Sequence, residues 1–143
     1  MQNSKNRLMK YFSERFGVDK GFWSNLKVHE KGKSLWITSN EVSLLDKFVA
    51  SGIRTLRIFD HGFKPTTYVL RLLNKEIKRN VVKLSKTELL NLIRDGERIE
   101  TDLSRGYVAL RFRGDVIGCG LIDSKGLRSQ IPKGLSQELE EIF

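Results

Sequence analysis

The sequence has little cysteine and proline: one cysteine, Cys119, and two prolines among 143 residues. A lone cysteine cannot form an internal disulfide, and a zinc site built from several thiolates is excluded. Long apolar runs are also missing. The run from Val116 to Ile122 spans seven residues, whereas a membrane-spanning helix needs about 20. No apolar segment follows the polar N-terminus, so we expect no signal peptide and a cytoplasmic location.

The composition is that of a folded globular protein with a strong excess of positive charge. Apolar residues make up 39% and charged residues 30%, and the net charge is +9. Residues 1–75 hold 14 Lys and Arg against 6 Asp and Glu, while residues 76–143 hold 12 against 11. Such an excess favours a polyanionic partner, most often nucleic acid and occasionally an anionic membrane surface. A basic face that binds nothing remains an alternative.

Residue patterning in the first half predicts a mixture of helices and strands. Leu8, Met9, Phe12 and Phe16 recur at helical spacing before Gly17, which predicts a helix over residues 5–16. Further expected elements are a helical turn at 19–24, a hairpin of 26–29 with 34–38, a helix over 41–50 capped by Asn40, a strand at 53–59 and a helix after Pro65.

The polar stretch 74–80 predicts a linker between domains at 1–75 and 81–143. After it, Ser85 and Glu88 form a capping box that starts a helix ending at Gly96. Strands are expected near Ile99, at 106–113 and at 116–122, with Gly114 and Asp115 in the hairpin turn, and a last helix is expected over 136–143. The expected fold class is α+β.

Catalytic chemistry finds little support in the sequence. Cys119 lies among apolar residues, which predicts a core cysteine rather than a nucleophile paired with His29 or His61. Two histidines without a third ligand at metal spacing make no metal site, and no cofactor motif is complete. We therefore expect neither a catalytic residue nor a metal nor a cofactor.

The basic residues give the sharper prediction. Strand alternation over 107–113 places Tyr107, Arg111 and Arg113 on one face, suited to phosphates and a stacked base. The alternative is an ordinary solvated sheet face. Lys125, Arg128 and Lys133 lie in a segment rich in Gly and Pro, which predicts a basic loop. The strand at 53–59 is bracketed by three further cations: Arg54, Arg57 and Lys64.

Several short segments resemble a known family. Residues 82–96, Gly106-Tyr107-Val108 and Gly118-Cys119-Gly120 resemble a PUA domain, a small β pseudo-barrel that binds structured RNA. Together with residues 127–135, the segments Phe16-Gly17-Val18, Gly52-Ile53-Arg54 and Phe63-Lys64-Pro65 resemble the C-terminal RNA-binding region of RsmF (Fmu/Sun-type) rRNA 5-methylcytosine methyltransferases. The resemblance implies an N-terminal α/β pre-PUA module followed by a C-terminal PUA-like pseudo-barrel.

The resemblance also implies a set of RNA-binding residues. In the PUA-like part these are Arg111, Arg113, Lys125, Arg128 and Lys133 with Tyr107, and Lys86, Arg94 and Arg98 around its helix; in the first half they are Arg54, Arg57, Lys64 and Arg71. The methyltransferase domain of that family, with its catalytic cysteines, has no counterpart in this sequence. Family activity is therefore not carried over.

The sequence thus predicts a stand-alone, non-catalytic RNA-binding protein acting on rRNA or pre-ribosomal particles, in ribosome biogenesis or rRNA modification. The expected partners are structured RNA, of ribosomal or tRNA-like type, and ribosome-assembly proteins, with no membrane. The main alternative is a targeting subunit for a separately encoded methyltransferase or pseudouridine synthase. An enzyme without a recognised motif and a protein-interaction scaffold are further alternatives.

Overall fold

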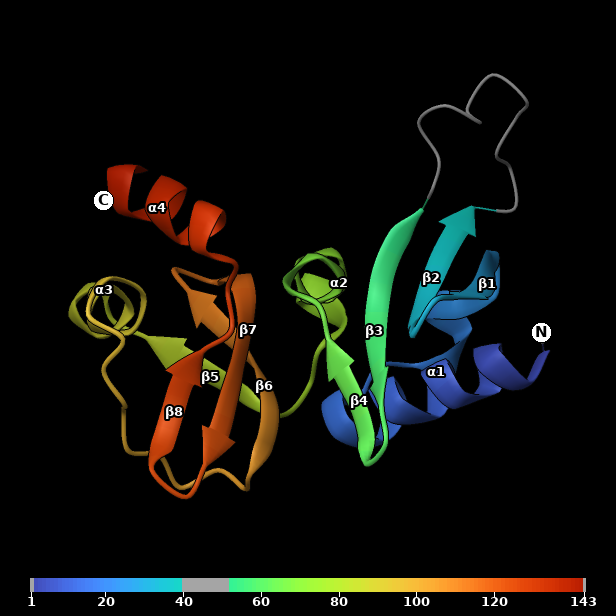
Figure 1. The fold of residues 1–143 in the computed structure, drawn as a ribbon, viewed down its shortest axis with the longest axis horizontal. Coiled ribbons are helices and arrows are strands. Elements are labelled where there is room, and N and C mark those ends of the chain that lie inside the picture. Colours follow the sequence, from blue (N-terminus) through green and yellow to red (C-terminus); the bar gives the residue numbers. More distant parts are fainter. Residues whose placement is uncertain (1, 40–51, 143) are drawn as a thin grey trace.

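The computed structural model describes residues 2–39 and 52–142, which hold two four-stranded sheets, one in each half of the chain (Figure 1). The first sheet is antiparallel with the order β1-β2-β3-β4. The elements of this half are α1 (Gln2–Phe16), a 3-10 turn (Lys20–Trp23), β1 (Leu26–Lys31), β2 (Ser34–Ser39), β3 (Ile53–Phe59), β4 (Gly62–Pro65) and α2 (Thr67–Leu73). The helix expected over 41–50 lies outside the described residues.

The second sheet has the order β5-β6-β7-β8 and curls into a half-closed barrel flanked by two helices (Figure 1). The β5–β6 pair is parallel and the other pairs are antiparallel. The elements of this half are β5 (Val81–Leu84), α3 (Lys86–Arg94), β6 (Gly106–Phe112), β7 (Asp115–Asp123), β8 (Gly126–Ser129) and α4 (Lys133–Ile142). The expected α+β character is confirmed.

Within residues 2–39 and 52–73, the predicted elements are present and several extend further than expected. Leu8, Phe12 and Phe16 are buried along one face of α1, and the helix ends where Gly17 takes a φ of 69°, a conformation that glycine adopts without strain. The predicted strand at 53–59 has the bounds of β3. No sequence pattern predicted β4, whose four residues are too few to show a period.

The second half corrects two expectations. Ser85 Oγ accepts a hydrogen bond from the Glu88 N–H at 3.1 Å, and Glu88 Oε1 accepts one from the Ser85 N–H at 2.9 Å, so the capping box is confirmed. The β6–β7 turn consists of Arg113 and Gly114, both with positive φ, one residue earlier than predicted. The basic loop predicted around Lys125, Arg128 and Lys133 was wrong, because β8 and the first turn of α4 occupy that segment.

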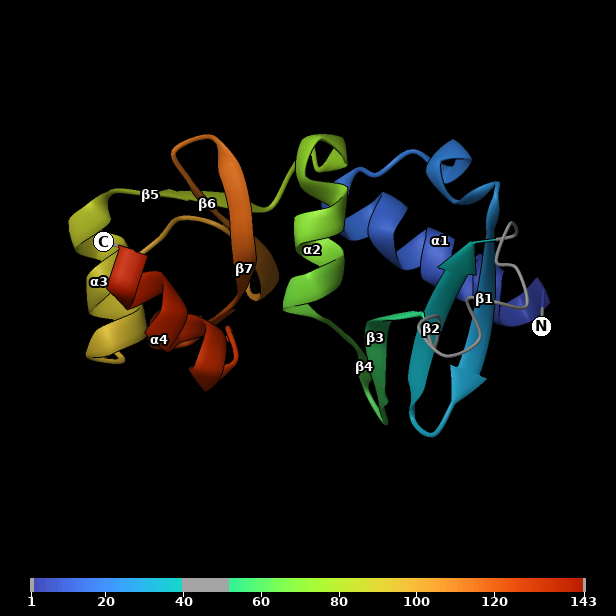
Figure 2. The ribbon, with the colours of Figure 1, turned by 90° about the horizontal axis from the view of Figure 1, so that it is seen from above.

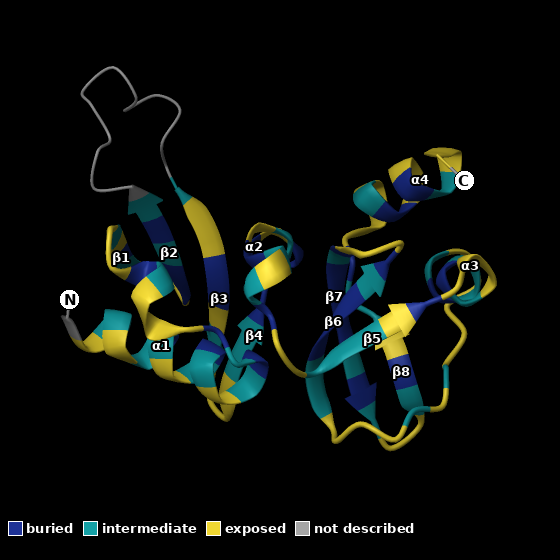
Figure 3. Ribbon diagram, turned by 180° about the vertical axis from the view of Figure 1, so that it is seen from behind, coloured by how far each residue is buried: buried dark blue, intermediate teal, exposed yellow. Residues whose placement is uncertain are grey.

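The two sheets share a core through β6 and β7. Val108, Leu110 and Phe112 pack into the cluster under α3 and α4. Ala109 of β6, with Val116 and Cys119 of β7, instead joins the core of the N-terminal half. Figure 3 shows β6 and β7 largely buried, while the outer faces of α3 and α4 are exposed. Both faces of β6 are thus covered.

The segment expected to be a linker is fastened to the N-terminal half. The Lys78 N–H donates to the Phe16 carbonyl at 2.8 Å, and the Arg79 guanidinium donates to the carbonyls of Ser13 and Glu14. Ahead of it, α2 lies between the two halves (Figure 2) and packs on β7. There the Thr67 hydroxyl accepts a hydrogen bond from the Cys119 N–H at 3.2 Å. The two halves are therefore joined by packing as well as by the chain.

Candidate nucleic-acid interface

Predicted cations from both halves gather where the two sheets meet. We call Arg54, Arg57, Lys64, Tyr107 and Arg128 the junction cluster. Arg57 of β3 and Lys64 of β4 are direct register partners, so their side chains leave the same face of the first sheet. Burial is the main reason that the pKa of Lys64 is lowered. The charges of Arg57, Arg128 and Arg54 lower it further, and Cys119 acts in the opposite direction. Cations from β3 and β8 thus lie near one amine.

Tyr107 of β6 lies within electrostatic reach of two arginines, Arg57 of β3 and Arg128 of β8. Burial chiefly raises the pKa of its phenol, Cys119 raises it further, and Arg128 and Arg57 lower it. Tyr107 is half-buried rather than solvent-exposed, with its ring packed against the N-terminal core. The face that the sequence assigned either to phosphates or to solvent is therefore partly covered by the N-terminal half of the chain.

The junction cluster concentrates like charge. Placing cations next to one another raises the free energy of the isolated protein, and an anionic ligand relieves that repulsion. Lys64 is partly desolvated, so its attraction for an anion is screened less than that of a fully exposed lysine. Arg128 also has a carboxylate nearby, since its Nε lies 3.9 Å from Asp123 Oδ2. The arrangement suits a chain of phosphates that crosses from one sheet to the other.

Arg111 and Arg113 do not share an exposed face, so that prediction was wrong. Arg111 keeps the alternation of β6, since Phe112 packs in the second core with Val108 and Leu110, but its face is covered by the N-terminal half. Arg113 lies beyond the end of β6, in the turn, with a φ of 52°. The Arg111 guanidinium is partly buried and donates from Nη2 to the Asn74 carbonyl at 3.1 Å. Arg113 stays exposed, with its guanidinium 4.8 Å from the Phe112 ring centroid.

Arg71 also holds the two halves together. Its Nε donates to the Ile117 carbonyl of β7 at 2.8 Å. At the end of α2, the side chain of Asn74 donates from Nδ2 to Asp115 and accepts at Oδ1 from the Val116 N–H. Arg71 and Arg111 therefore bind the protein's own backbone, and their first role is to fix the position of α2 against β7.

The remaining predicted cations are spread over the second half. Arg94 pairs with Glu140 at 2.8 Å, and Arg98 pairs with Asp123, so neighbouring carboxylates offset both charges. Lys86, Lys125 and Lys133 are exposed, at the start of α3, in the β7–β8 turn and at the start of α4. These residues do not extend the junction cluster into one continuous positive track.

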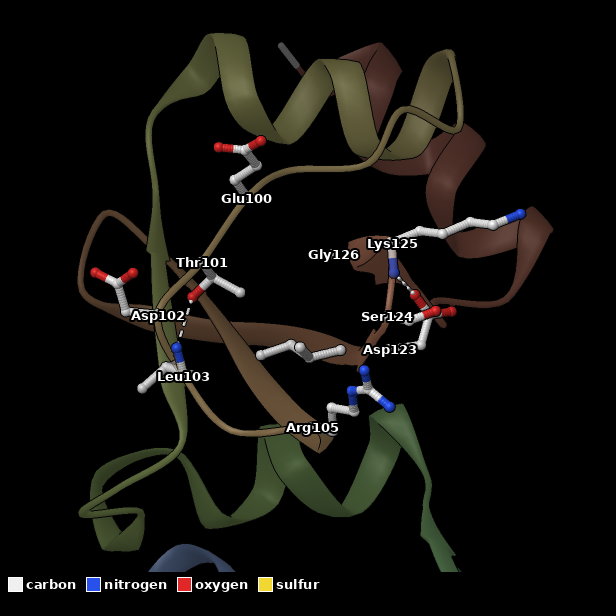
Figure 4. Close-up of a pocket in the computed structure, with 10 residues that line it drawn as sticks. Glu100, Thr101, Asp102, Leu103, Arg105, Asp123, Ser124, Lys125 and Gly126 are labelled. Carbon is white, nitrogen blue, oxygen red and sulfur yellow. Dashed lines mark hydrogen bonds between the residues drawn. The ribbon is translucent and has the colours of Figure 1, made fainter.

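A polar cavity of about 630 Å³ lies beside the β7–β8 turn (Figure 4). It mixes charges of both signs, with Arg105 and Lys125 among Glu100, Asp102 and Asp123. The hydrogen bond from the Lys125 N–H has the largest effect on Asp123 and lowers the pKa of its carboxyl group. Desolvation acts in the opposite direction, and Arg98 and Arg128 lower the pKa further, so that it lies below its usual value. The acidic side chains in its lining weaken this cavity as a phosphate site. Arg105 was missed by the sequence analysis, because no pattern places it beside Lys125.

The second cavity, of about 820 Å³, is apolar and lies on the N-terminal half. Trp36, Ile53, Tyr68 and Leu72 line it, with Arg54 and Arg71 also contributing. Arg54 thus connects this cavity with the junction cluster.

Cys119 is a core residue, as the sequence predicted. Burial raises the pKa of its thiol to about 12, partly offset by Lys64, so the thiolate needed for nucleophilic attack is disfavoured at neutral pH. Within residues 2–39 and 52–142, no three His, Cys, Asp or Glu side chains group as metal ligands would. Over the same residues, the structure has no helix both long and apolar enough to cross a membrane.

Comparison with known proteins identifies the second half. Residues 79–136 match the family model described as the methyltransferase RsmF PUA domain, a span that runs from just before β5 into α4. No curated protein matches the chain. The match covers the curled sheet and α3, which confirms the PUA resemblance read from the sequence and suggests RNA binding. Residues 79–136 of this chain therefore resemble the PUA domain of the C-terminal region of RsmF.

Proposed function

We propose that this protein binds structured RNA without altering it, using the PUA domain together with the cations of the N-terminal sheet. The observation that carries the proposal is the junction cluster, where Arg57 of the first sheet and Arg128 of the second both act on Lys64 and on Tyr107. Phosphates crossing the junction would displace counterions from both halves, and the PUA surface would select the RNA by shape.

The proposed targets are rRNA or pre-ribosomal particles in the cytoplasm, in ribosome biogenesis or rRNA modification. The support is the match to a PUA domain of the RsmF type and the net charge of +9. Of the predicted site residues, Arg54, Arg57, Lys64, Tyr107 and Arg128 form the proposed centre. Five exposed or partly paired cations, Lys86, Arg94, Arg98, Lys125 and Lys133, serve as peripheral phosphate contacts, and Arg113 extends them from the β6–β7 turn.

A second candidate function is that of a targeting subunit for a separately encoded RNA-modifying enzyme. The apolar cavity lined by Trp36, Ile53, Tyr68 and Leu72 favours it, because exposed apolar surface is characteristic of protein contacts. Gain of a methyltransferase or pseudouridine synthase activity on addition of this chain would support this candidate, and co-purification with no such enzyme would count against it.

Salt-dependent binding to rRNA fragments tests the main proposal. If about six phosphates are contacted, a plot of log affinity against log salt should fall with a slope of roughly −4 to −5. The double variant R57A/R128A should bind more weakly and lower the steepness of the slope by about 2, since each lost phosphate contact removes about 1.

A matched control is K27A, which removes an exposed cation of β1 and should leave the slope near that of the wild type. Affinity that does not change with salt would overturn the proposal. An unchanged slope in R57A/R128A would remove the junction cluster from the binding site.

A further inference from the structure

Phe59 is an apolar ring left in solvent at the end of a strand whose centre is buried. It is the last residue of β3 and is 49% exposed, whereas Leu56 in the same strand is fully buried. Its register partner across the hairpin is Gly62, which has no side chain to cover it. A Cβ built at Gly62 would meet no atom within 4 Å, so there is open space beside the ring.

The charges next to Phe59 distinguish it from other exposed apolar residues. Alternation along β3 puts Arg57 on the same face as Phe59, and the Arg57 guanidinium lies over the ring, 5.5 Å from its centroid. Lys64 faces Arg57 across the hairpin. By contrast, Ile53, Tyr68 and Leu72 are exposed around the apolar cavity. Phe59 thus lies at the edge of the junction cluster.

An aromatic ring beside cations matches the chemistry of an unpaired nucleotide. The flat face of a base stacks on the ring, and the phosphates on either side are neutralised by Lys and Arg. A base inside a duplex is stacked on its neighbours and cannot take this position. An apolar protein segment would gain from the ring but would be opposed by the desolvation of Arg57 and Lys64.

We propose that Phe59 is a stacking platform for an unpaired RNA base, so that the β3–β4 hairpin reads a single-stranded segment next to the structured RNA held by the PUA domain. This inference rests on the proposed function and adds a second specificity, for an unpaired extension. It assigns the N-terminal sheet a direct role in recognition that the PUA family match, confined to residues 79–136, does not cover.

The test compares two RNAs, an rRNA hairpin with a single-stranded extension and the same hairpin with a blunt end. F59A should weaken binding of the extended RNA by roughly tenfold to a hundredfold, the range expected for losing one base–aromatic stack, and should leave the blunt RNA bound as before. F59Y should retain the preference for the extension. F59L, which keeps apolar bulk without an aromatic face, should lose most of it.

The matched control is Y68A, which removes an aromatic side chain of the same 49% exposure from α2 and should change neither affinity. A direct readout is F59W, whose added tryptophan fluorescence should be quenched by the extended RNA and not by the blunt one.

The inference would be overturned if F59A bound the extended RNA like the wild type, or if it lost affinity equally for both RNAs. Equal losses in F59A and Y68A would overturn it as well. Failure of the wild type to bind either RNA would instead contradict the proposed function, so the two failures are distinguishable.

Discussion

Arginines of similar sequence context have different tasks in this molecule, and their partners decide which. Arg57 is exposed and lies opposite Lys64 across the β3–β4 hairpin, within the junction cluster. Arg111, which the sequence predicted to face solvent or phosphates, instead donates to the Asn74 carbonyl. Its Nε is buried without a hydrogen-bond partner. Removing a side chain of the first kind weakens binding of an anion, whereas removing one of the second kind weakens the fold.

We therefore expect R111A to lower the free energy of unfolding by about 1–3 kcal/mol, because it leaves a carbonyl unpaired and opens packing space between the halves. R57A should change it by less than about 0.5 kcal/mol, as expected for an exposed residue. Denaturant unfolding of both variants at one salt concentration measures this. If R111A and R57A were equally stable, Arg111 would be a surface residue, as the sequence alone had suggested.

Single elements were the most predictable part of the structure. The capping box placed α3, and apolar spacing placed α1 and β3, because these signals are local. The burial of Arg111 was not predictable, since the carbonyl that it contacts belongs to Asn74, in the other half of the chain. The junction cluster was predicted only as separate cations. Its assembly depends on the tertiary placement of β3, β4 and β8, which no local pattern encodes.

The C-terminal end of α1 depends on a segment more than 60 residues away. The Asn80 amide donates to the Arg15 carbonyl, and the Arg79 guanidinium lies at the helix end, where a positive charge is favoured by the helix dipole. Asn80 has a φ of 58°, which asparagine tolerates better than most residues. The supposed linker thus serves as the cap of a helix.

Substitutions at Asn80 separate the hydrogen bond from the backbone conformation. N80G should cost about 1 kcal/mol, because glycine keeps the positive φ and only the amide bond is lost. N80A should cost about 2–3 kcal/mol, since a left-handed conformation adds roughly 1–2 kcal/mol. Denaturant unfolding measures both, with K75A as a control at an exposed position. Equal losses in the two variants would contradict a strained backbone at this residue.

The junction between the two halves buries ionisable groups from both of them. Burial raises the pKa of the Tyr11 phenol well above its usual 10.0, with smaller effects of Cys119, Arg15 and Tyr107. Cys119, from β7, has a thiol pKa raised from 9.0 to about 12. Both groups hold their protons more tightly in the folded protein than in the unfolded chain, so the fold is coupled to pH through its centre.

Alkaline pH should therefore destabilise the protein. The stability is fully present below pH 9 and is lost as pH rises through the window between the ordinary and the raised pKa values, by about 1.4 kcal/mol per pH unit for each group. The Cys119 contribution begins to fall near pH 9 and the Tyr11 contribution near pH 10. The lowered pKa of Lys64 acts in the opposite direction, but solvent screens this half-exposed side chain. Unfolding free energies measured by denaturant titration from pH 8 to 11 test this.

Two variants separate the contributions of Cys119 and Tyr11 to the loss of stability at alkaline pH. C119A should remove the part that begins near pH 9, and Y11F should remove the part that begins near pH 10 while keeping the ring contacts with Phe12, Phe16 and Phe63. Both variants differ from the wild type in stability at pH 8, so the change with pH is the quantity compared. A wild-type protein equally stable at pH 8 and 10.5 would show that the junction is open to water, and the partial desolvation of Lys64 that favours an anionic ligand there would be lost with it.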